Sequence, residues 1–167
     1  TPLLLHFNHG FGANCLTWDP LFEALDQDGC RAWLCAHDRC GFGLTSRPAD
    51  YRRYADDVNS RFALELLRRL PLGAADATCA TPERVVLVGH SLGGALTARM
   101  AADAARDTAR HGDIARRISA LILIAPALIP RSTSLVDRAR PTASPSFSET
   151  LVERLLAALE GATAALR

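Results

Sequence analysis

The sequence predicts an α/β fold in which helices cover both faces of a mostly parallel sheet. Four short apolar runs lack the polar alternation of half-exposed strands, which indicates that each strand is buried on both faces. Stretches with helical periodicity follow these runs in turn, and this alternation is typical of parallel sheets with right-handed crossovers. The predicted strands span residues 3–7, 32–36, 84–88 and 118–125.

The first two predicted helices have clear limits in the sequence. Asp19 is the expected N-cap and Pro20 the first helical residue, and Gly29 follows the end of the helix. A second helix is expected over residues 55–70, where an apolar residue recurs at every fourth position until Pro71 stops the helix. The expected apolar faces are Leu21, Phe22 and Leu25 in the first helix and Val58, Phe62, Leu66 and Leu70 in the second.

The rest of the chain is organised around this core. An alanine-rich helix is expected over residues 92–110, which completes a predicted core of residues 1–129. The proline-rich stretch 130–148 is expected to be a connector. Residues 149–167, with leucines at helical spacing, are expected to start a lid or cap helix. The expected loop and linker are residues 44–54 and 73–82.

The size, composition and charge of the chain limit the classes of function that it can have. A chain of 167 residues with 49% hydrophobic residues predicts one soluble globular domain. Nineteen basic residues balance 18 acidic ones, so the overall charge gives no electrostatic reason to expect binding to nucleic acid or to a membrane surface. No apolar run is long enough to span a bilayer, and no signal peptide is seen. The absence of a starting Met indicates further sequence upstream.

The cysteines indicate free thiols. There are five, an odd number, and no Cys-x-x-Cys pair occurs among them, which disfavours both a zinc site and a disulfide framework. The thiols are expected to be mostly buried and reduced. This favours an intracellular reducing compartment such as the cytoplasm or a plastid, with the location otherwise unknown, and no metal or other cofactor is expected. The cysteines are Cys15, Cys30, Cys35, Cys40 and Cys79.

One turn carries the strongest chemical signal. The branched apolar run 85–88 leads directly into a Gly-x-Ser-x-Gly turn at residues 89–93, and a helical pattern follows at once. Such a sharp strand-to-helix turn places Ser91 in a strained backbone conformation with its hydroxyl exposed at the sheet edge. Gly89 and Gly93 flank it because side chains there would collide with the turn and with the departing helix.

Two other predicted strands also end in glycine-containing turns. One turn follows the first strand at residues 8–12, and the other follows the second strand at residues 38–43. Ligands of parallel sheets bind beyond the carboxyl ends of the strands. We therefore expect these two turns to meet the serine turn at one crevice.

The four strand ends together resemble the α/β-hydrolase superfamily, in its lipase, esterase and haloperoxidase-like branch; residues 42–48 are similar to plant and algal members. The resemblance implies that Ser91 is a nucleophile for a small carboxylic ester or related acyl substrate. It also implies an oxyanion hole formed by the backbone N–H groups of Phe11 and Leu92. Serine in place of aspartate disfavours the dehalogenase and epoxide-hydrolase relatives. The motifs are Asn8-His9-Gly10-Phe11-Gly12, Asp38-Arg39-Cys40-Gly41-Phe42-Gly43, Gly89-His90-Ser91-Leu92-Gly93-Gly94 and Leu121-Ile122-Leu123-Ile124-Ala125-Pro126.

Other residues near the crevice are expected to support it. Gly10, with Gly89 and Gly93, is expected to shape the turns, and the resemblance implies that His9 is a structural residue beside its loop rather than a base. His90 adjoins the nucleophile and should project away from the Ser91 side chain. Asp38 and Arg39 are expected to hold the turn before Gly41 and Gly43. Trp18 and Phe42 either line an acyl pocket or belong to the core.

A base and an orienting acid for Ser91 are not apparent. In this fold the acid and then the histidine follow the serine, but His111 is the only downstream histidine. A continuous helix would carry it about 30 Å away, and Asp137 lies in the expected connector. The acid and base are therefore expected beyond Arg167. Either the chain is an excerpt of a longer serine hydrolase, inactive alone and prone to aggregate at an open sheet edge, or it is a truncated, non-catalytic binding or scaffold relative.

The same residues would also suit a cofactor-free oxygenase or peroxidase-like activity, which the sequence does not distinguish from ester hydrolysis. The substrate itself is not readable, because specificity resides in lid and loop side chains.

Overall fold

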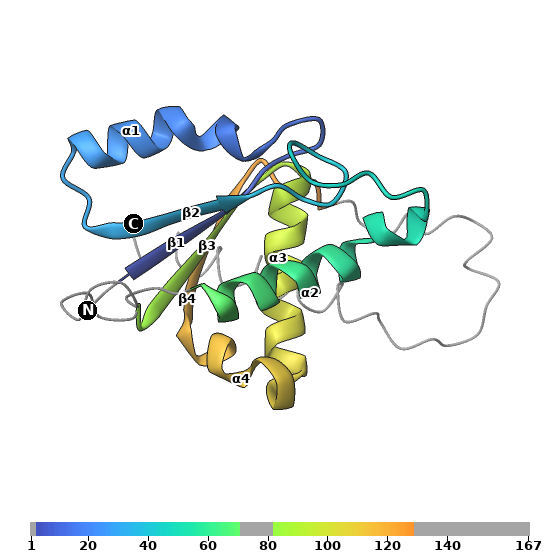
Figure 1. The fold of residues 1–167 in the computed structure, drawn as a ribbon. Coiled ribbons are helices and arrows are strands. Elements are labelled where there is room, and N and C mark those ends of the chain that lie inside the picture. The colour runs from blue at the N-terminus through green and yellow to red at the C-terminus, as the bar shows by residue number, and fades with distance from the viewer. Residues whose placement is uncertain (1–2, 71–81, 129–167) are drawn as a thin grey trace, which may run out of the picture. The chain divides into compact units, whose positions relative to one another are not determined.

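The computed structural model describes residues 3–70 and 82–128, and it confirms the predicted α/β fold class. The strands form one fully parallel sheet in the order β2-β1-β3-β4 (Figure 1). Each strand begins and ends within two residues of its predicted limits. The strands are β1 (Leu3–Asn8), β2 (Ala32–His37), β3 (Arg84–His90) and β4 (Ile118–Ile124).

Strand register brings the predicted turns to one edge of the sheet. Asn8, the last residue of β1, is level with His37 of β2 and with Gly89 of β3. His90, at the end of β3, is level with Ile124 of β4. All four strands therefore deliver the chain to the same edge, as the sequence predicted for the first three.

Helices cover both faces of the sheet. On one face, α1 (Asp19–Gln27) packs through Phe22 and Leu25 onto a cluster that includes Phe7, Val86 and Val88. The opposite face is covered by α2 (Asp56–Arg69), α3 (Leu92–Arg106) and α4 (Thr108–Arg117). Two short 3₁₀ helices, η1 (Cys15–Trp18) and η2 (Tyr51–Tyr54), complete the described elements, and η2 lies inside the stretch expected to be loop.

The first helix differs slightly from its prediction. Asp19 is its first residue rather than its N-cap, and Trp18 precedes it without a side-chain capping bond. Gly29 ends the helix as predicted, with a φ of 73° that a glycine adopts without strain. Leu21 is 37% exposed, so the apolar stripe consists of Phe22 and Leu25 alone.

The predicted apolar face of α2 is wrong at Phe62, which is half exposed, although Leu70 packs partly buried against the core. The fully buried residues are one or two positions further along the helix and include Asn59 and Ser60. Small and polar residues lie inward because α2 packs closely on α3, where the Ser60 hydroxyl donates to the Asp103 carboxylate at 2.8 Å. A pattern of large apolar residues alone could not reveal this. The buried face is Asn59, Ser60, Ala63, Leu64 and Leu67.

The single helix predicted over residues 92–110 is also wrong. The helix ends at Arg106, and α4 begins at Thr108 after one non-helical residue. Asp107 causes the break by capping α4, because its carboxylate accepts a hydrogen bond from the Arg110 N–H at 3.1 Å. His111 consequently lies on a separate helix and is buried.

The strands are less completely covered than predicted. On β4, Ile122 and Ile124 are 48% and 42% exposed, and Trp33 of β2 is 39% exposed. Both strands are the outer strands of the described sheet, whereas β3 between them is buried from Val85 to Gly89. The continuous apolar run therefore identified the strands correctly but overstated the burial of the outer ones.

Other predictions meet the structure only in part. Cys15, Cys35 and Cys40 are half-buried free thiols and Cys30 is an exposed one, so the expected burial is wrong for these four.

No helix in residues 3–70 and 82–128 is long and apolar enough to cross a membrane. Several predictions lie outside the described residues: Pro71 as helix stop, the linker 73–81, Cys79, the connector 130–148 with Asp137, and the lid helix 149–167.

Two histidines stack between the sheet and α2. His6 Nε2 lies 3.0 Å from His37 Nδ1, the rings are 5.0 Å apart and nearly parallel, and Phe62 contacts His37 from α2. Burial lowers the pKa of His6 well below its usual value, and His37 lowers it further. Burial, with smaller contributions from His9 and Arg39, lowers the pKa of His37 to about 4, although Asp38 opposes this. The pair is therefore neutral in the folded protein.

This neutral pair predicts a loss of stability in acid. The unfolded chain takes up protons on these imidazoles as the pH falls below about 6.5, whereas folded His37 resists protonation until about pH 4. Between pH 8 and pH 5, His37 alone should lower the free energy of unfolding by about 2 kcal/mol. Urea unfolding of wild type at both pH values should show this decrease in the free energy of unfolding, and His37→Gln should reduce the decrease by about 2 kcal/mol. His90→Gln, which replaces an exposed histidine, should show the same decrease as wild type. Equal decreases in the two variants would show that His37 does not cause the acid sensitivity.

Candidate active site

Ser91 lies in a strained turn between β3 and α3, as predicted. Its φ and ψ are 53° and −120°, a region that residues other than glycine rarely adopt. The turn is held from both sides by β4 and the loop after it. The Ser91 N–H donates to the Ile124 carbonyl at 2.9 Å, and the Ser91 carbonyl accepts from the Ala127 N–H at 2.8 Å. The strain is therefore fixed by neighbouring backbone rather than by the serine itself.

The flanking glycines are required by close packing. A Cβ on Gly93 would overlap the carbonyl oxygens of Asn8 and His9, and a Cβ on Gly89 would overlap the Gly93 carbonyl and the Thr97 hydroxyl. The overlap at Gly89 is with the departing helix, as expected from the sequence, whereas the overlap at Gly93 is with the end of β1, which was not expected. This second overlap shows that the start of α3 contacts the end of β1 through backbone atoms.

The loop after β1 lies directly against the serine. A Cβ on Gly10 would be only 3.3 Å from the Ser91 Cβ, so no larger residue fits there without a shift. Phe11 follows Gly10, and Leu92 opens α3 next to Ser91. In the described part of the chain, the backbone N–H groups of Phe11 and Leu92 have no hydrogen-bond acceptor. Two amide donors thus lie on the two segments that border Ser91.

His9 supports this loop and is not placed as a base. Its Nε2 accepts a hydrogen bond from the Arg39 N–H at 3.1 Å, so its Nδ1 carries the proton and donates to the Gly10 carbonyl at 2.8 Å. Burial lowers the pKa of His9, while the Gly10 carbonyl acts in the opposite direction. With both ring nitrogens engaged, His9 holds the loops after β1 and β2 together, as predicted.

Asp38 joins the same two loops more strongly. One carboxylate oxygen accepts from the Cys15 N–H at 2.7 Å and the other from the Leu44 N–H at 2.8 Å. Burial alone would raise the pKa of Asp38, but these two amide bonds outweigh it and the pKa lies below its usual value. A Cβ on Gly43 would overlap this carboxylate, which explains that glycine. Asp38 is thus a structural residue of the turn, as predicted.

Arg39 is almost fully buried beside Asp38. One of its terminal nitrogens lies 3.3 Å from the Asp56 carboxylate, and the guanidinium lies 5.7 Å from the centre of the Phe42 ring. Burial lowers the pKa of Arg39, which Asp56 partly opposes. The Arg39 carbonyl accepts from the Thr45 hydroxyl at 2.6 Å, so the residue fixes the turn through both backbone and side chain.

The two aromatic candidates have different places. Trp18 is 6% exposed and packs on Phe7 beneath α1, so it belongs to the core. Phe42 contacts both His9 and Phe11 edge to face, with ring centres 5.5 and 5.7 Å away. Phe42 therefore supports the side chain of Phe11 next to Ser91.

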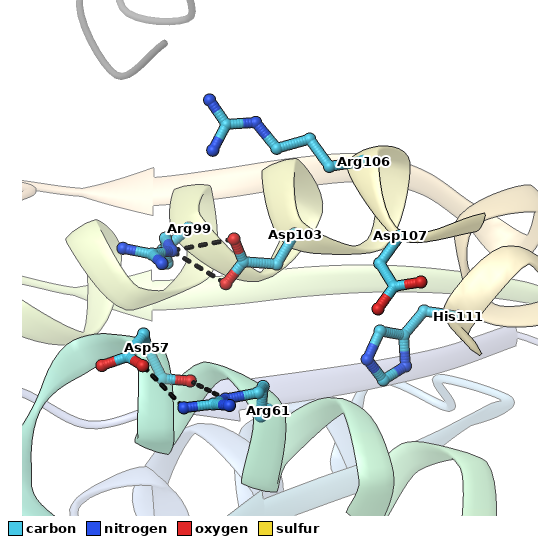
Figure 2. A pocket seen from close by; sticks show the side chains of 7 residues that line it. All are labelled: Asp57, Arg61, Arg99, Asp103, Arg106, Asp107 and His111. Carbon is cyan, nitrogen blue, oxygen red and sulfur yellow. Dashed lines mark hydrogen bonds and ion pairs between the residues drawn. The ribbon is translucent and has the colours of Figure 1, made fainter. Parts of the chain in front are cut away.

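His111 lies at the far end of α3 from Ser91. The fifteen residues of α3 separate them by about 22 Å, so His111 remains excluded as a base even though the predicted helix breaks. It lines a polar hollow of about 280 Å³ between α2, α3 and α4 (Figure 2). Ion pairs join Arg61 to Asp57 and Arg99 to Asp103 there. Three arginines face three aspartates, so the hollow has no net charge to select an ionic ligand.

The clamp formed by Ile124 and Ala127 was not predicted. The sequence carries one signal near it, because a small residue and a proline follow the apolar run of β4 and indicate a tight turn. The structure has that turn, with a φ of 42° at Ala125 and with Pro126 so close to Gly94 that no Cβ would fit there. Nothing in their spacing indicates that the turn bonds to a serine more than thirty positions earlier.

Comparison with known proteins identifies the family. A model of the alpha/beta hydrolase family matches residues 3–166. The chain belongs to this family. Among curated proteins, the 1-acylglycerol-3-phosphate O-acyltransferase ABHD5 of Sus scrofa is 31% identical over 134 residues, which cover 80% of this chain and 32% of that relative. The chain thus spans about a third of the length of this relative.

Solved structures agree with the hydrolase fold. A probable hydrolytic enzyme from Pseudomonas aeruginosa PAO1 superposes with a TM-score of 0.57 at 24% identity, over 86% of this chain and 37% of that one. A variant of polyneuridine aldehyde esterase superposes with a TM-score of 0.54 at 19% identity, over 80% of this chain and 44% of that one. At these identities the likeness shows the fold, and esterases and lipolytic enzymes are among the proteins that share it.

The packing at Gly93 predicts a large effect of a single methyl group. Gly93→Ala should lower the free energy of unfolding by about 1–3 kcal/mol or more, because the new Cβ must push α3 away from β1. At the matched helical glycine, Gly112, a Cβ would meet no atom closer than 3.5 Å, so Gly112→Ala should stabilise α4 by roughly 0.5–1 kcal/mol. Urea unfolding of both variants tests this, and equal effects would contradict the packing argument.

The two bonds to Asp38 predict a second stability effect. Asp38→Asn leaves one oxygen to accept from two loop amides, so the free energy of unfolding should fall by about 1–3 kcal/mol. Asp28→Asn, at an exposed carboxylate after α1, is the control and should change stability by less than about 0.5 kcal/mol. A wild-type unfolding midpoint for Asp38→Asn would show that the carboxylate does not hold the loops.

Proposed function

We propose that the protein is a serine hydrolase that cleaves a small carboxylic ester or related acyl compound through an acyl-enzyme on Ser91. The observation that carries the proposal is the strained conformation of Ser91, with a φ of 53°, beside two backbone amides without acceptors in the described residues. Strain at one polar side chain at the edge of a parallel sheet is typical of a functional position.

The proposed reaction uses Ser91 and the two amides in separate roles. The Ser91 oxygen attacks the carbonyl carbon of the ester while a general base removes the hydroxyl proton. The carbonyl oxygen becomes an oxyanion that accepts from the N–H groups of Phe11 and Leu92. The alcohol leaves with the proton, and water then attacks the acyl-enzyme to release the acid and restore Ser91.

The base is the part of this proposal that the described residues do not supply. Both ring nitrogens of His9 are engaged, His111 lies at the far end of α3, and the Ser91 hydroxyl has no hydrogen-bond partner within residues 3–70 and 82–128. This observation favours a second candidate function, a non-catalytic binding or scaffold protein on the hydrolase fold. The proposal of hydrolysis therefore requires an acid and a histidine from other parts of the protein.

The acyl acceptor is a further choice within the first proposal. The Sus scrofa relative is named as an acyltransferase, in which an alcohol rather than water would receive the acyl group. The chemistry at Ser91 is the same until the second step. Product analysis with and without an added alcohol would distinguish hydrolysis from transfer.

A covalent probe tests the nucleophile directly. A fluorophosphonate should label the full-length protein at Ser91, because a base-activated serine attacks phosphorus as it attacks an ester carbonyl. Ser91→Ala should abolish labelling, and Ser119→Ala, at an exposed serine on β4, should leave it unchanged. Equal labelling of wild type and Ser91→Ala would exclude Ser91 as nucleophile. Absence of labelling in a folded wild-type protein would favour the binding or scaffold function.

A further inference from the structure

Large apolar side chains are exposed on the loops that follow β1 and β2. Leu44, Phe11 and Leu16 are 98%, 78% and 64% exposed, and they lie on the segments that follow β1 and β2. Single exposed apolar residues are common on proteins, whereas a group of them at one place marks an interaction surface. We call these three residues the apolar rim.

Contacts already described hold the apolar rim together. The Asp38 carboxylate accepts from the backbone N–H of Leu44 and from that of Cys15, the residue before Leu16. Both leucines therefore extend from a backbone bound to the same carboxylate. Phe11 joins them through its edge-to-face contact with Phe42, two residues before Leu44. The three residues of the apolar rim are thus carried by loops that are joined to one another through Asp38 and Phe42.

The turn that carries Leu44 is firmly built. The Thr45 hydroxyl lies 2.6 Å from the carbonyls of Arg39 and Phe42, and the Thr45 N–H donates to the Phe42 carbonyl at 3.0 Å. Gly43 packs against Asp38 without room for a Cβ. A leucine at the tip of such a turn is held outward by its backbone, so its exposure does not come from fraying.

Positive charge lies beside Leu44. The Arg47 guanidinium donates to the carbonyls of Gly43 and Thr45, at 3.1 and 3.4 Å, and these residues are the two neighbours of Leu44. Residues 44–54 contain three arginines and one aspartate, and Arg52 pairs with that aspartate, Asp50. The charge that lies directly beside Leu44 is therefore that of Arg47, although the whole chain is close to neutral.

We propose that the apolar rim, with Arg47, binds the surface of an anionic lipid assembly. Leu44 and Leu16 would insert among the acyl chains, and Arg47 would lie at the level of the headgroup phosphates. Exposed leucines next to an arginine suit such a surface, because the leucines can contact the acyl chains while the guanidinium contacts the headgroup phosphates. This binding goes beyond the proposed hydrolysis and does not depend on it, although it would bring the loop of Phe11, and with it Ser91, towards the lipid surface.

Sedimentation with vesicles tests the proposal on the purified full-length protein. Wild type should pellet with phosphatidylcholine vesicles that contain phosphatidylglycerol, and more weakly with phosphatidylcholine alone. The double variant Leu16→Ser/Leu44→Ser should reduce the partition coefficient by about tenfold or more, because both inserted side chains are lost. Arg47→Ala should reduce it about fivefold on the anionic vesicles and leave it unchanged on phosphatidylcholine.

Two controls separate this binding from folding and from catalysis. Leu21→Ser, at a partly exposed leucine on α1, should bind vesicles as wild type does. Ser91→Ala should also bind as wild type, so a failure of the hydrolase proposal leaves the lipid result unaffected. Wild type that stays in solution with both vesicle types would overturn the proposal, as would equal losses for Leu21→Ser and the double variant. Vesicle-free dimers that the double variant abolishes would instead assign the apolar rim to a second copy of the chain.

Discussion

The candidate site depends on the absence of a side chain at Gly93. Because no Cβ intervenes, the first turn of α3 rests on the carbonyl oxygens of Asn8 and His9 at the end of β1. That contact fixes the distance between the serine turn and the loop that begins at Gly10. The segments of Phe11 and Leu92, whose amides have no acceptor among residues 3–70 and 82–128, are neighbours for this reason, and the proposed nucleophile and oxyanion hole both require it.

A second layer of polar contacts supports the first. His9 and Asp38 each bridge the loops after β1 and β2, one through ring nitrogens and the other through carboxylate oxygens. Both are buried polar residues at the edge of the sheet that carries Ser91, and either could be mistaken for a catalytic group from its position. Their engaged atoms show that they build the site. The bonds of Asp38 to the backbone of Cys15 and Leu44 also hold the loops that carry Leu16 and Leu44. The proposed lipid surface and the proposed catalytic site therefore depend on the same hydrogen bonds.

The sequence was sufficient for those features that local sterics determine. The strands follow from continuous branched apolar runs, and the turn at Ser91 follows from two glycines around a serine between strand and helix. Their arrangement at one edge follows from parallel pairing. These inferences need only the chemistry of a few adjacent residues, and the structure confirms them.

Features that depend on distant partners were not predictable. The inward face of α2 carries Asn59 and Ser60 because α3 is close, and no periodicity of apolar residues contains that information. At Asp107 the chain can either continue α3 or start α4, because the Asp107 side chain can cap a new helix. The alanine-rich sequence by itself favours the continuous helix. The exposure of Ile122 and Ile124 depends on which helices cover β4. The burial of Trp18 likewise depends on Phe7 and α1.

The clamp on Ser91 has a consequence for how the protein is made. The serine turn is complete in sequence once residue 94 has been synthesised, but its two fixing bonds come from Ile124 and Ala127. Before those residues are made, the Ser91 carbonyl has only its local partners, the N–H groups of Gly94 and Ala95 at 2.9 and 3.3 Å. We therefore expect the strained turn to be fixed only after residue 127 has been synthesised, when β4 has added to the sheet.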